Sequence, residues 1–325
     1  MPSTNETDVD TYFSYLDDAH GAPTVVVIGN FDGLHRGHMT LLRTAHTLAR
    51  DAQIGFSVLT FSPHPARVLA PHRAPPSLMS DIEKATAFRR LGVDAVWFQQ
   101  FTTDFADLSP RSFVEDVLKA GLGAVHVVVG FDFRFGQGRA GTTETLRELL
   151  VTNGMRLTVI EAVQDGVAKV SSSAIREAMT YADIERVNAL LGWSYAIEGL
   201  VIRGDARGRT IDFPTLNIQL GEQLYPSEGV YCGWLESGDK HLAAVANLGA
   251  RPTVGDARTA QLEVHVMGTD LGDMYDRPVR FVFHSKIRRI ERFDDLNALR
   301  DQIAQDVVEA QRALAGVSPA ILSLS

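Results

Sequence analysis

The stretch that organises the chain is Val25-Val26-Val27-Ile28-Gly29-Asn30-Phe31-Asp32-Gly33-Leu34-His35-Arg36-Gly37-His38. An apolar run ends at a glycine, a short turn rich in glycine and aspartate follows, and two histidines come just before an amphipathic segment. That order predicts a buried strand, a phosphate-binding loop and a helix. The glycines let the backbone approach a bulky anion, and the start of the helix offers unpaired N–H groups.

His35 and His38 are the candidate catalytic groups of this loop. Their N–H groups can donate to phosphate oxygens, and a donor that meets charge developing in a transition state contributes roughly 3 to 4 kcal/mol. The helix dipole contributes only about 0.3 to 1 kcal/mol, so the histidines dominate. No Gly-Lys-Ser or Gly-Lys-Thr follows, which excludes a Walker A loop. An ordinary strand–helix turn with surface histidines is the other interpretation, and it leaves the match of strand, glycines and helix unexplained.

The composition limits the class of protein. The chain has 325 residues, a hydrophobic content of 45% and a formal charge of −9. Its length allows two domains with sizeable cores, and its negative charge argues against a nucleic-acid partner. One cysteine, Cys232, excludes an internal disulfide and a cysteine-based zinc site. Since the first twenty residues lack an apolar segment and no run reaches the ~18 residues of a membrane span, we expect a cytoplasmic protein that binds no membrane.

Residues 20–191 alternate apolar runs with helical periodicity. We expect strands at 25–28, 55–61, 95–98, 126–129 and 157–160, and helices at 39–50, 82–91, 110–120, 143–153 and 181–191. Short apolar strands separated by helices predict an α/β domain of Rossmann-like type, with a parallel sheet covered on both faces. Ligands of such sheets bind beyond the carboxyl ends of the strands, so the loops after the strands form the candidate site.

Three of these loops carry further motifs. Phe61-Ser62-Pro63-His64-Pro65 follows the second strand, and its prolines predict an extended loop that holds an imidazole rigidly. Gly130-Phe131-Asp132-Phe133-Arg134-Phe135-Gly136 follows the fourth strand, and its rings offer stacking faces to a heterocycle. Val170-Ser171-Ser172-Ser173-Ala174-Ile175-Arg176 follows the fifth, where hydroxyls at a helix start and one guanidinium suit an anion.

The pattern changes after residue 192. Segments 197–202, 229–235, 242–246, 261–267 and 279–283 predict strands, with alternation clearest at 262–266. A final amphipathic helix opens at Asp294 or Asp295, so residues 195–315 predict a small antiparallel β-barrel with a terminal helix. Within this half, Thr215 and Asn217 place a hydroxyl and an amide oxygen on one side of an extended segment, which suits Mg²⁺.

These motifs together resemble those of the bacterial bifunctional riboflavin kinase/FAD synthetases. Asn-Phe-Asp-Gly-x-His-x-Gly-His looks like the family's adenylyltransferase signature, and the patterns Phe-x-Pro-His-Pro and Gly-x-Asp-Phe-x-Phe-Gly are met at 61–65 and 130–136. The family's Ser-Ser-Thr-x-Ile-Arg is present with Ser173 in place of the threonine, which keeps the hydroxyl. In the second half, 204–209, 213–217, 247–253 and 262–265 resemble the kinase motifs. The resemblance covers about residues 20–315.

The resemblance implies two ATP- and Mg²⁺-dependent activities. Residues 195–315 would phosphorylate riboflavin to FMN, and residues 20–191 would adenylylate FMN to FAD and release pyrophosphate. His35 and His38 are the implied catalytic groups of the second step, and Glu263 is the implied base that activates the riboflavin 5′-hydroxyl. The implied ATP-binding residues of the adenylyltransferase are Gly29, Phe31, Asp32, Gly33, His35, His38, Ser171, Ser172, Ser173 and Arg176, and Asp32 would orient either a histidine or the ribose. The implied FMN-binding residues are Phe61, Pro63, His64, Pro65, Asp132, Phe133, Phe135 and Gly136. The implied kinase ligands are Gly204, Gly208, Arg209, Pro214, Thr215, Asn217, Asn247, Arg251 and Arg288, with Thr215 and Asn217 on the metal.

Four positions depart from the family's kinase pattern. Asp212 and Asp276 replace glycines, Leu216 replaces an alanine, and Ile290 replaces a glutamate. An aspartate beside the phosphates of ATP would either repel them or bind the metal. Two other interpretations therefore stay open: an active adenylyltransferase with a silent kinase or one redirected to a flavin analogue, and a flavin-binding regulator without catalysis. The presence of His35, His38 and Glu263 argues against the regulator, since binding alone does not need them. The oligomeric state is left open.

Overall fold

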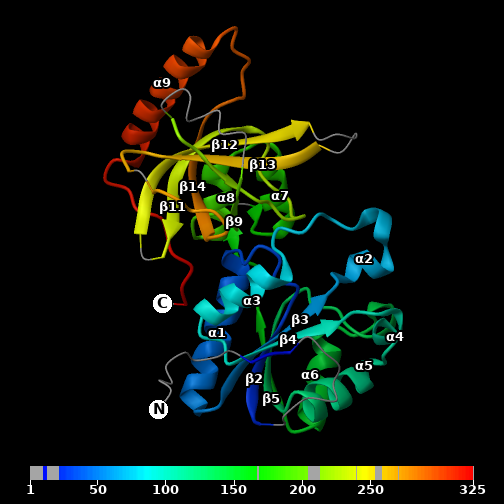
Figure 1. Ribbon diagram of the computed structural model, residues 1–325. Helices are drawn as coiled ribbons and strands as arrows, with labels where there is room; N and C mark the ends of the chain where they lie inside the picture. The colour runs from blue at the N-terminus through cyan, green and yellow to red at the C-terminus, as the bar shows by residue number, and fades with distance from the viewer. Residues whose placement is uncertain are drawn as a thin grey trace. The chain divides into compact units, whose positions relative to one another are not determined.

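The computed structural model describes residues 10–12, 22–166, 168–203, 213–238, 240–252, 258–269 and 271–324 (Figure 1). Its contacts divide the chain into two units, Met1–Ser171 with Leu322–Ser325, and Ser172–Ile321. The predicted module limits, 20–191 and 195–315, stay a prediction. Across the described ranges, no helix is long and apolar enough to cross a bilayer.

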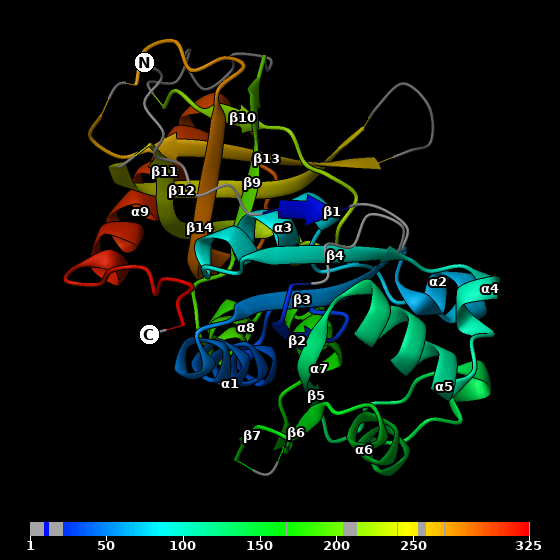
Figure 2. The ribbon, with the colours of Figure 1, turned by 90° about the horizontal axis from the view of Figure 1, so that it is seen from below.

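The first unit is built on a six-stranded sheet in the order β1-β4-β3-β2-β5-β6. Its strands are β1 (Asp10–Tyr12), β2 (Thr24–Ile28), β3 (Gly55–Ser62), β4 (Ala95–Gln100), β5 (Ala124–Gly130) and β6 (Arg156–Ile160). Every pair of neighbours is parallel, as predicted. Figure 2 shows β4, β3, β2 and β5 side by side in this order. All five residues of β2 are buried, which explains its continuous apolar sequence.

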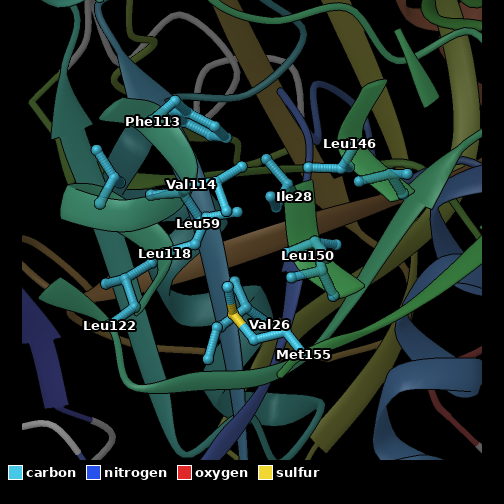
Figure 3. Close-up of a cluster of buried hydrophobic side chains, with 14 of the residues drawn as sticks. Val26, Ile28, Leu59, Phe113, Val114, Leu118, Leu122, Leu146, Leu150 and Met155 are labelled. Atoms are coloured by element: carbon cyan, nitrogen blue, oxygen red, sulfur yellow. The ribbon is translucent and has the colours of Figure 1, made fainter. Parts of the chain in front are cut away.

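Helices cover both faces of this sheet. The helices of this unit are α1 (Arg36–Ala52), α2 (Pro65–Leu69), α3 (Asp81–Arg90), α4 (Thr103–Ala106), α5 (Pro110–Ser112), the π-helical η3 (Phe113–Gly121) and α6 (Thr143–Thr152). The strands β7 (Gln164–Asp165) and β8 (Ala168–Lys169) form a small separate hairpin. Alternate residues of β2 point to one face, where Figure 3 shows the core formed with η3 and α6 by Val26, Ile28, Val114, Leu118, Leu146 and Leu150. On the opposite face α1 contacts the sheet, with the His46 ring 5.9 Å from that of Phe56.

The loop after β3 differs from the prediction of an extended segment. The Ser62–Pro63 peptide is cis, and a short helix begins immediately at Pro65. The side chain of His64 caps that helix, since its Nδ1 accepts the backbone N–H of Ala66 at 3.1 Å. Proline at the first helical position has a suitable φ and needs no hydrogen-bond donor. The prediction was wrong because it weighed only the helix-breaking effect of proline.

The second unit begins with two helices and continues as a closed antiparallel barrel, with strand order β10-β13-β12-β11-β14-β9. Its elements are α7 (Ser172–Thr180), α8 (Ile184–Leu191), β9 (Ala196–Ile202), β10 (Leu216–Ile218), β11 (Gly229–Ser237), β12 (Lys240–Pro252), β13 (Arg258–Val266), β14 (Pro278–Arg288) and α9 (Leu296–Leu314). The barrel and its terminal helix confirm the predicted architecture. Asp295 caps α9 by accepting the N–H groups of Asn297 and Ala298.

Helix α9 packs on the barrel through a small apolar cluster and one ion pair. The cluster joins α9 to β11, β12 and β14 through Ala310, Leu314, Val230, Cys232, Trp234, Val245 and Val282. Arg288 donates from Nε to Oδ1 of Asp306 at 2.8 Å and from Nη2 to Oδ2 at 2.9 Å. Asp306 is only 2% exposed, so this two-point contact fixes the helix against β14.

Candidate active sites

The loop between β2 and α1 has a strained backbone. Phe31 and Leu34 take positive φ angles of 49° and 45°, and Gly33 takes 93°. A non-glycine residue in this region costs on the order of 1 to 3 kcal/mol, so the surroundings must hold it there. Phe31 and Leu34 are both fully buried, and their packing supplies that restraint. The loop is therefore fixed by the core beneath it.

The two histidines stand at the beginning of α1 as a stacked pair. His35 is the N-cap, and its Nδ1 accepts the backbone N–H of His38 at 3.3 Å. The neutral His35 ring must then carry its proton on Nε2, which makes Nε2 a hydrogen-bond donor. The rings of His35 and His38 stack with centroids 3.7 Å apart and planes 13° apart. A Cβ at Gly37 would lie 3.1 Å from Cε1 of His35, so a glycine there leaves room for the ring.

Burial keeps both imidazoles uncharged. It lowers the pKa of His35 from its ordinary 6.5 to about 4, opposed by a backbone hydrogen bond and assisted by the charge of Lys169. The pKa of His38 is lowered well below its ordinary value, first by burial and then by His35 and Lys84. His38 Nδ1 is buried without a hydrogen-bond partner in the part of the chain that the structure describes. Both rings are thus neutral groups at pH 7, able to donate to an anion.

Asp32 connects this loop to the segment before α3. Its Oδ1 accepts the backbone N–H groups of Leu78 at 2.8 Å and Met79 at 3.2 Å. The resemblance implies that Asp32 orients either a histidine or the ribose. The contacts with Leu78 and Met79 add a structural role, because they hold the loop to the segment before α3. Phe31 continues the connection, since its ring meets those of His38 and Phe88 edge to face at 5.2 and 5.5 Å.

Aromatic side chains from the end of β3, the segment after β4, the start of η3 and the loop after β5 form a continuous row. The rings in contact are, in order, Phe61, Phe101, Phe105, Phe113, Phe135 and Phe133. Phe135 lies in the hydrophobic core, so at least part of its role is packing. Gly136 has φ 70°, and a Cβ there would lie 3.0 Å from Pro110. The row therefore joins the ends of β3 and β5, the two loops in which flavin contacts were predicted.

Lys169 is a residue of this region that the sequence did not single out. Its Nζ forms an ion pair with Asp132 Oδ2 at 2.5 Å and lies 4.8 Å from the centroid of the Phe131 ring. Phe131 is 39% exposed, whereas the predicted Phe133 and Phe61 pack partly against the core. Because the hairpin that carries Lys169 is distant in sequence from 130–136, only the fold reveals the contact. The predicted anion-binding residues Ser172, Ser173 and Arg176 lie in the first turns of α7, directly after Ser171.

In the barrel, three polar residues share one register position. Asn217 of β10 and Asn247 of β12 both stand directly opposite Glu263 of β13. Residues directly opposite on antiparallel strands project from the same face of the sheet, so the structure brings these three together. The neighbours of Glu263 along the strand, Leu262 and Val264, are fully buried, which assigns Glu263 to the other face. The amide Nε2 of Gln261 donates to Oδ1 of the buried Asn217.

The Phe-Pro-Thr segment is attached to β13 by a histidine. His265 Nδ1 lies 2.9 Å from the carbonyl oxygen of Pro214, which can only accept, so Nδ1 carries the proton. The rings of Phe213 and His265 meet edge to face at 5.2 Å. Pro214 and Thr215 are thereby held beside the strand that carries Glu263. Gly204, Gly208, Arg209 and Asp212 lie outside the described residues, as does the side chain of Arg251.

Comparison with known proteins is consistent across both units. The FAD synthetase family model matches residues 17–174, and the riboflavin kinase model matches residues 191–314. The bifunctional riboflavin kinase/FMN adenylyltransferase of Escherichia coli (strain K12) is 38% identical over 297 residues, covering 91% of this chain and 94% of that protein. The chain belongs to this family. The Bacillus subtilis (strain 168) member is 34% identical over 93% of this chain and 96% of its own length.

Another bifunctional riboflavin kinase/FMN adenylyltransferase, from Pseudomonas fluorescens, is 38% identical over 90% of this chain and 94% of its own. Among solved structures, that of a macrolide-efflux protein from Streptococcus pneumoniae has a TM-score of 0.83 at 30% identity, covering 93% of this chain and 98% of that one. The fold of both units of this chain is therefore found together in that single solved chain.

The departures from the riboflavin kinase pattern have local explanations at two positions. Asp276 has φ 60°, a left-handed conformation that glycine favours and that aspartate tolerates better than most residues. Ile290 packs near the Asn247 motif, with its Cδ1 3.1 Å from where a Cβ of Gly249 would stand. Arg288, a predicted ligand, uses its guanidinium within the protein, since Nη1 donates to the Arg289 carbonyl and the other nitrogens bind Asp306. In the described ranges no three His, Cys, Asp or Glu side chains gather to hold a metal.

Proposed function

We propose that this chain converts riboflavin to FAD in two steps, each at its own site. The barrel unit transfers the γ-phosphoryl group of ATP to riboflavin, and the α/β unit joins FMN to the adenylyl group of a second ATP. The observation that carries the proposal is the neutral stacked pair of His35 and His38 at the start of α1. Family membership supports the same pair of reactions.

In the adenylyl transfer, an oxygen of the FMN phosphate attacks the α-phosphorus of ATP in line. The bond from that phosphorus to the bridging oxygen breaks, and pyrophosphate leaves. His35 Nε2–H and the N–H of His38 donate to phosphate oxygens as negative charge builds on them. The strained loop and the N–H groups at the start of α1 hold the triphosphate in position. No covalent intermediate is needed. Gly29, Gly33 and Ser171 complete the proposed anion site of this unit, and the rings after β3 and β5 receive the flavin. Ser172, Ser173 and Arg176 at the start of α7 stay predicted ATP ligands.

In the phosphorylation, Glu263 takes the proton of the riboflavin 5′-hydroxyl while that oxygen attacks the γ-phosphorus and ADP leaves. Asn217 and Asn247 flank the base and supply amide groups to the substrates. Thr215 and Asn217 offer the hard oxygen donors that Mg²⁺ prefers, so the donor set fits this ion. Bound there, Mg²⁺ would neutralise charge on the phosphates. We also propose a cytoplasmic location, because both steps consume ATP and Cys232 is a free thiol.

The proposal is tested by incubating the purified chain with ATP and Mg²⁺, once with riboflavin and once with FMN, and separating the flavins by chromatography. Riboflavin should yield both FMN and FAD. If FMN yields FAD while riboflavin is untouched, the kinase is silent or redirected, and flavin analogues are the next substrates. If neither flavin reacts, the interpretation as a flavin-binding regulator replaces ours.

A further inference from the structure

Thr215 and Asn217, the predicted cation donors of the kinase, lie on a segment that is only partly held by backbone pairing. The strand β10 pairs with β13 only over Leu216–Ile218. Thr215 stands just before this strand, and Pro214 has no N–H with which to extend the pairing. Asn217 lies within the strand, but backbone pairing does not set the direction of its side-chain amide. Other contacts must therefore fix both donors.

Two side chains of β13 supply such contacts. Gln261 donates from Nε2 to Oδ1 of Asn217. His265 donates from Nδ1 to the carbonyl oxygen of Pro214, over a distance of 2.9 Å. The segment is thus attached to β13 on both sides of Thr215.

The proposed base of the kinase lies between these two attachments. Gln261, Glu263 and His265 are alternate residues of β13, so they project from one face of the strand. Leu262 and Val264, which alternate with them, are fully buried in the barrel. One strand therefore carries the base and, two residues to either side of it, the groups that hold the cation donors.

Both contacts leave the donor atoms available to a cation. The carbonyl oxygen of an amide has two lone pairs, so Oδ1 of Asn217 can accept from Gln261 and still bind a metal ion. The same hydrogen bond fixes the orientation of the Asn217 amide, because its oxygen and not its NH₂ group faces Gln261. His265 binds a backbone oxygen, so its hydrogen bond does not involve the hydroxyl of Thr215.

We propose that Gln261 and His265 are positioning residues for the phosphorylation of riboflavin. They hold the cation donors at a fixed place relative to Glu263, so that donors and base face the same substrate. Groups that orient metal ligands from outside typically account for about 10- to 100-fold in metal affinity or activity. The inference rests on the proposed function of the barrel unit.

The attachment can be tested without turnover, by NMR of the full chain titrated with Mn²⁺ and ADP. Mn²⁺ takes the oxygen donors that suit Mg²⁺, and its binding at Thr215 and Asn217 should broaden the backbone amide signals of Leu216 and Ile218. In His265→Phe, which keeps a ring but no donor, the Mn²⁺ concentration for half-maximal broadening should rise about tenfold or more. His265→Asn, whose Nδ2 takes the place of the imidazole Nδ1, should stay within about twofold of the unmodified chain.

The matched control is His284→Phe, because His284 is a half-buried ring of the same barrel whose centroid lies 5.5 Å from that of Trp234. It should leave the broadening in place. Gln261→Met, which keeps the side-chain length but cannot donate, should act like His265→Phe, and His265→Ala replaces His265→Phe if the latter does not fold. The proposal is overturned if either donor-free variant titrates like His284→Phe, or if the unmodified chain shows no broadening at these amides.

FMN formation from riboflavin and ATP supplies the second readout. In His265→Phe and Gln261→Met, kcat should fall about tenfold or more, and the Mg²⁺ concentration for half-maximal rate should rise by a similar factor. His265→Asn should restore both values, and FAD formation from supplied FMN should stay within about twofold in all variants. A rate lowered by the same factor at every Mg²⁺ concentration would reflect loss of folded protein alone and overturns the proposal. If the unmodified chain forms no FMN, the proposed function fails, and the Mn²⁺ titration still decides whether β13 holds the cation donors.

Discussion

His35 shows how one residue serves both folding and chemistry. Histidine is an unusual helix N-cap, yet its Nδ1 takes the place of a serine or aspartate oxygen and accepts the N–H of His38. The same hydrogen bond fixes the tautomer and leaves Nε2–H as the donor. A Ser or Asp cap would support the helix equally well but would not give this donor, so the choice of histidine reflects the proposed reaction.

The buried, neutral state of His35 predicts a loss of stability in mild acid. Its pKa is about 4 in the folded chain and 6.5 in the unfolded one, so the unfolded state binds the proton first as the pH falls. The first unit should therefore lose about 2 kcal/mol between pH 7 and pH 5, and the loss is complete once the pH falls below the folded pKa. Hydrogen exchange of the β2 amides at the two pH values measures it.

The matched control for this experiment is His35→Asn, which keeps a side-chain acceptor at the N-cap and removes the titrating ring. Its β2 amides should show a smaller pH dependence than those of the unmodified chain. His38 contributes in the same direction, so part of the dependence will remain. An unchanged dependence in His35→Asn would place the acid sensitivity in other groups.

At the residue scale the sequence predicts which groups lie in the loop but not their neighbours. The spacing of His35 and His38, with the glycines around them, is enough to expect a strand–loop–helix anion site. Lys84 and Lys169 escape this reasoning because each is an isolated lysine in an ordinary segment. Only the fold shows that Lys84 is buried and paired with Asp81, and that Lys169 pairs with Asp132 beside the Phe131 ring. Arg288 illustrates the reverse case, since its motif suggests a ligand while its partner on α9 is invisible in the sequence.

At the element scale, strongly apolar or amphipathic segments were predicted well. The expected strand at 55–61 is β3, and the expected terminal helix is α9 with Asp295 as its cap. The missed strands are short: β1 is three residues with no apolar run, and β10 is three residues directly after Phe213-Pro214-Thr215. The expected helix at 181–191 starts only at Ile184, because Ala182 has φ 55° and Asp183 provides the cap. The switch from α5 to the π-helical η3 changes hydrogen bonding without changing the apolar periodicity, so the sequence does not indicate it.

The ion pair between α9 and the barrel leads to a prediction about this element. Asp306→Leu should destabilise the barrel unit by roughly 3 to 5 kcal/mol, because it leaves the partly buried guanidinium of Arg288 without its partner. The free energy of unfolding in urea, followed by the fluorescence of Trp234 in β11, measures the effect. Glu309→Ala, an exposed acid on the same helix, should change it by less than about 0.5 kcal/mol.

The double variant Arg288→Met with Asp306→Leu separates packing from ligand binding. Replacing both charges by apolar groups should recover most of the lost stability. If Arg288 acts only through α9, riboflavin kinase activity should recover together with stability. Recovery of stability without recovery of kinase activity would show that Arg288 also contacts a substrate, as its motif suggests.

At the scale of the whole molecule, the chain combines two solutions to phosphate chemistry. The α/β unit uses a strained loop, a helix start and neutral donors, which suits attack at the α-phosphorus without a protein base. The barrel unit aligns a carboxylate with two amides across three strands, which suits removal of a proton from a hydroxyl. The sequence indicated the first directly, because its groups lie within one short segment. The second was implied only by the resemblance to the kinase motifs, and the shared register of Asn217, Asn247 and Glu263 is seen only in the fold.

This division predicts that each reaction can be removed alone. His38→Ala should lower FAD formation from FMN by about 10² to 10³-fold, the usual loss of one transition-state donor, and leave FMN formation from riboflavin within twofold. Glu263→Gln should lower FMN formation by about 10² to 10⁴-fold, as expected for a general base, while FAD formation from supplied FMN stays within twofold. Both rates are measured on the full chain by chromatography of the flavins. His72→Ala and Glu309→Gln, which alter exposed side chains, are the matched controls and should change neither rate. Loss of both activities in either active-site variant, with folding intact, would mean that the two reactions share one site and would contradict the assignment of one reaction to each unit.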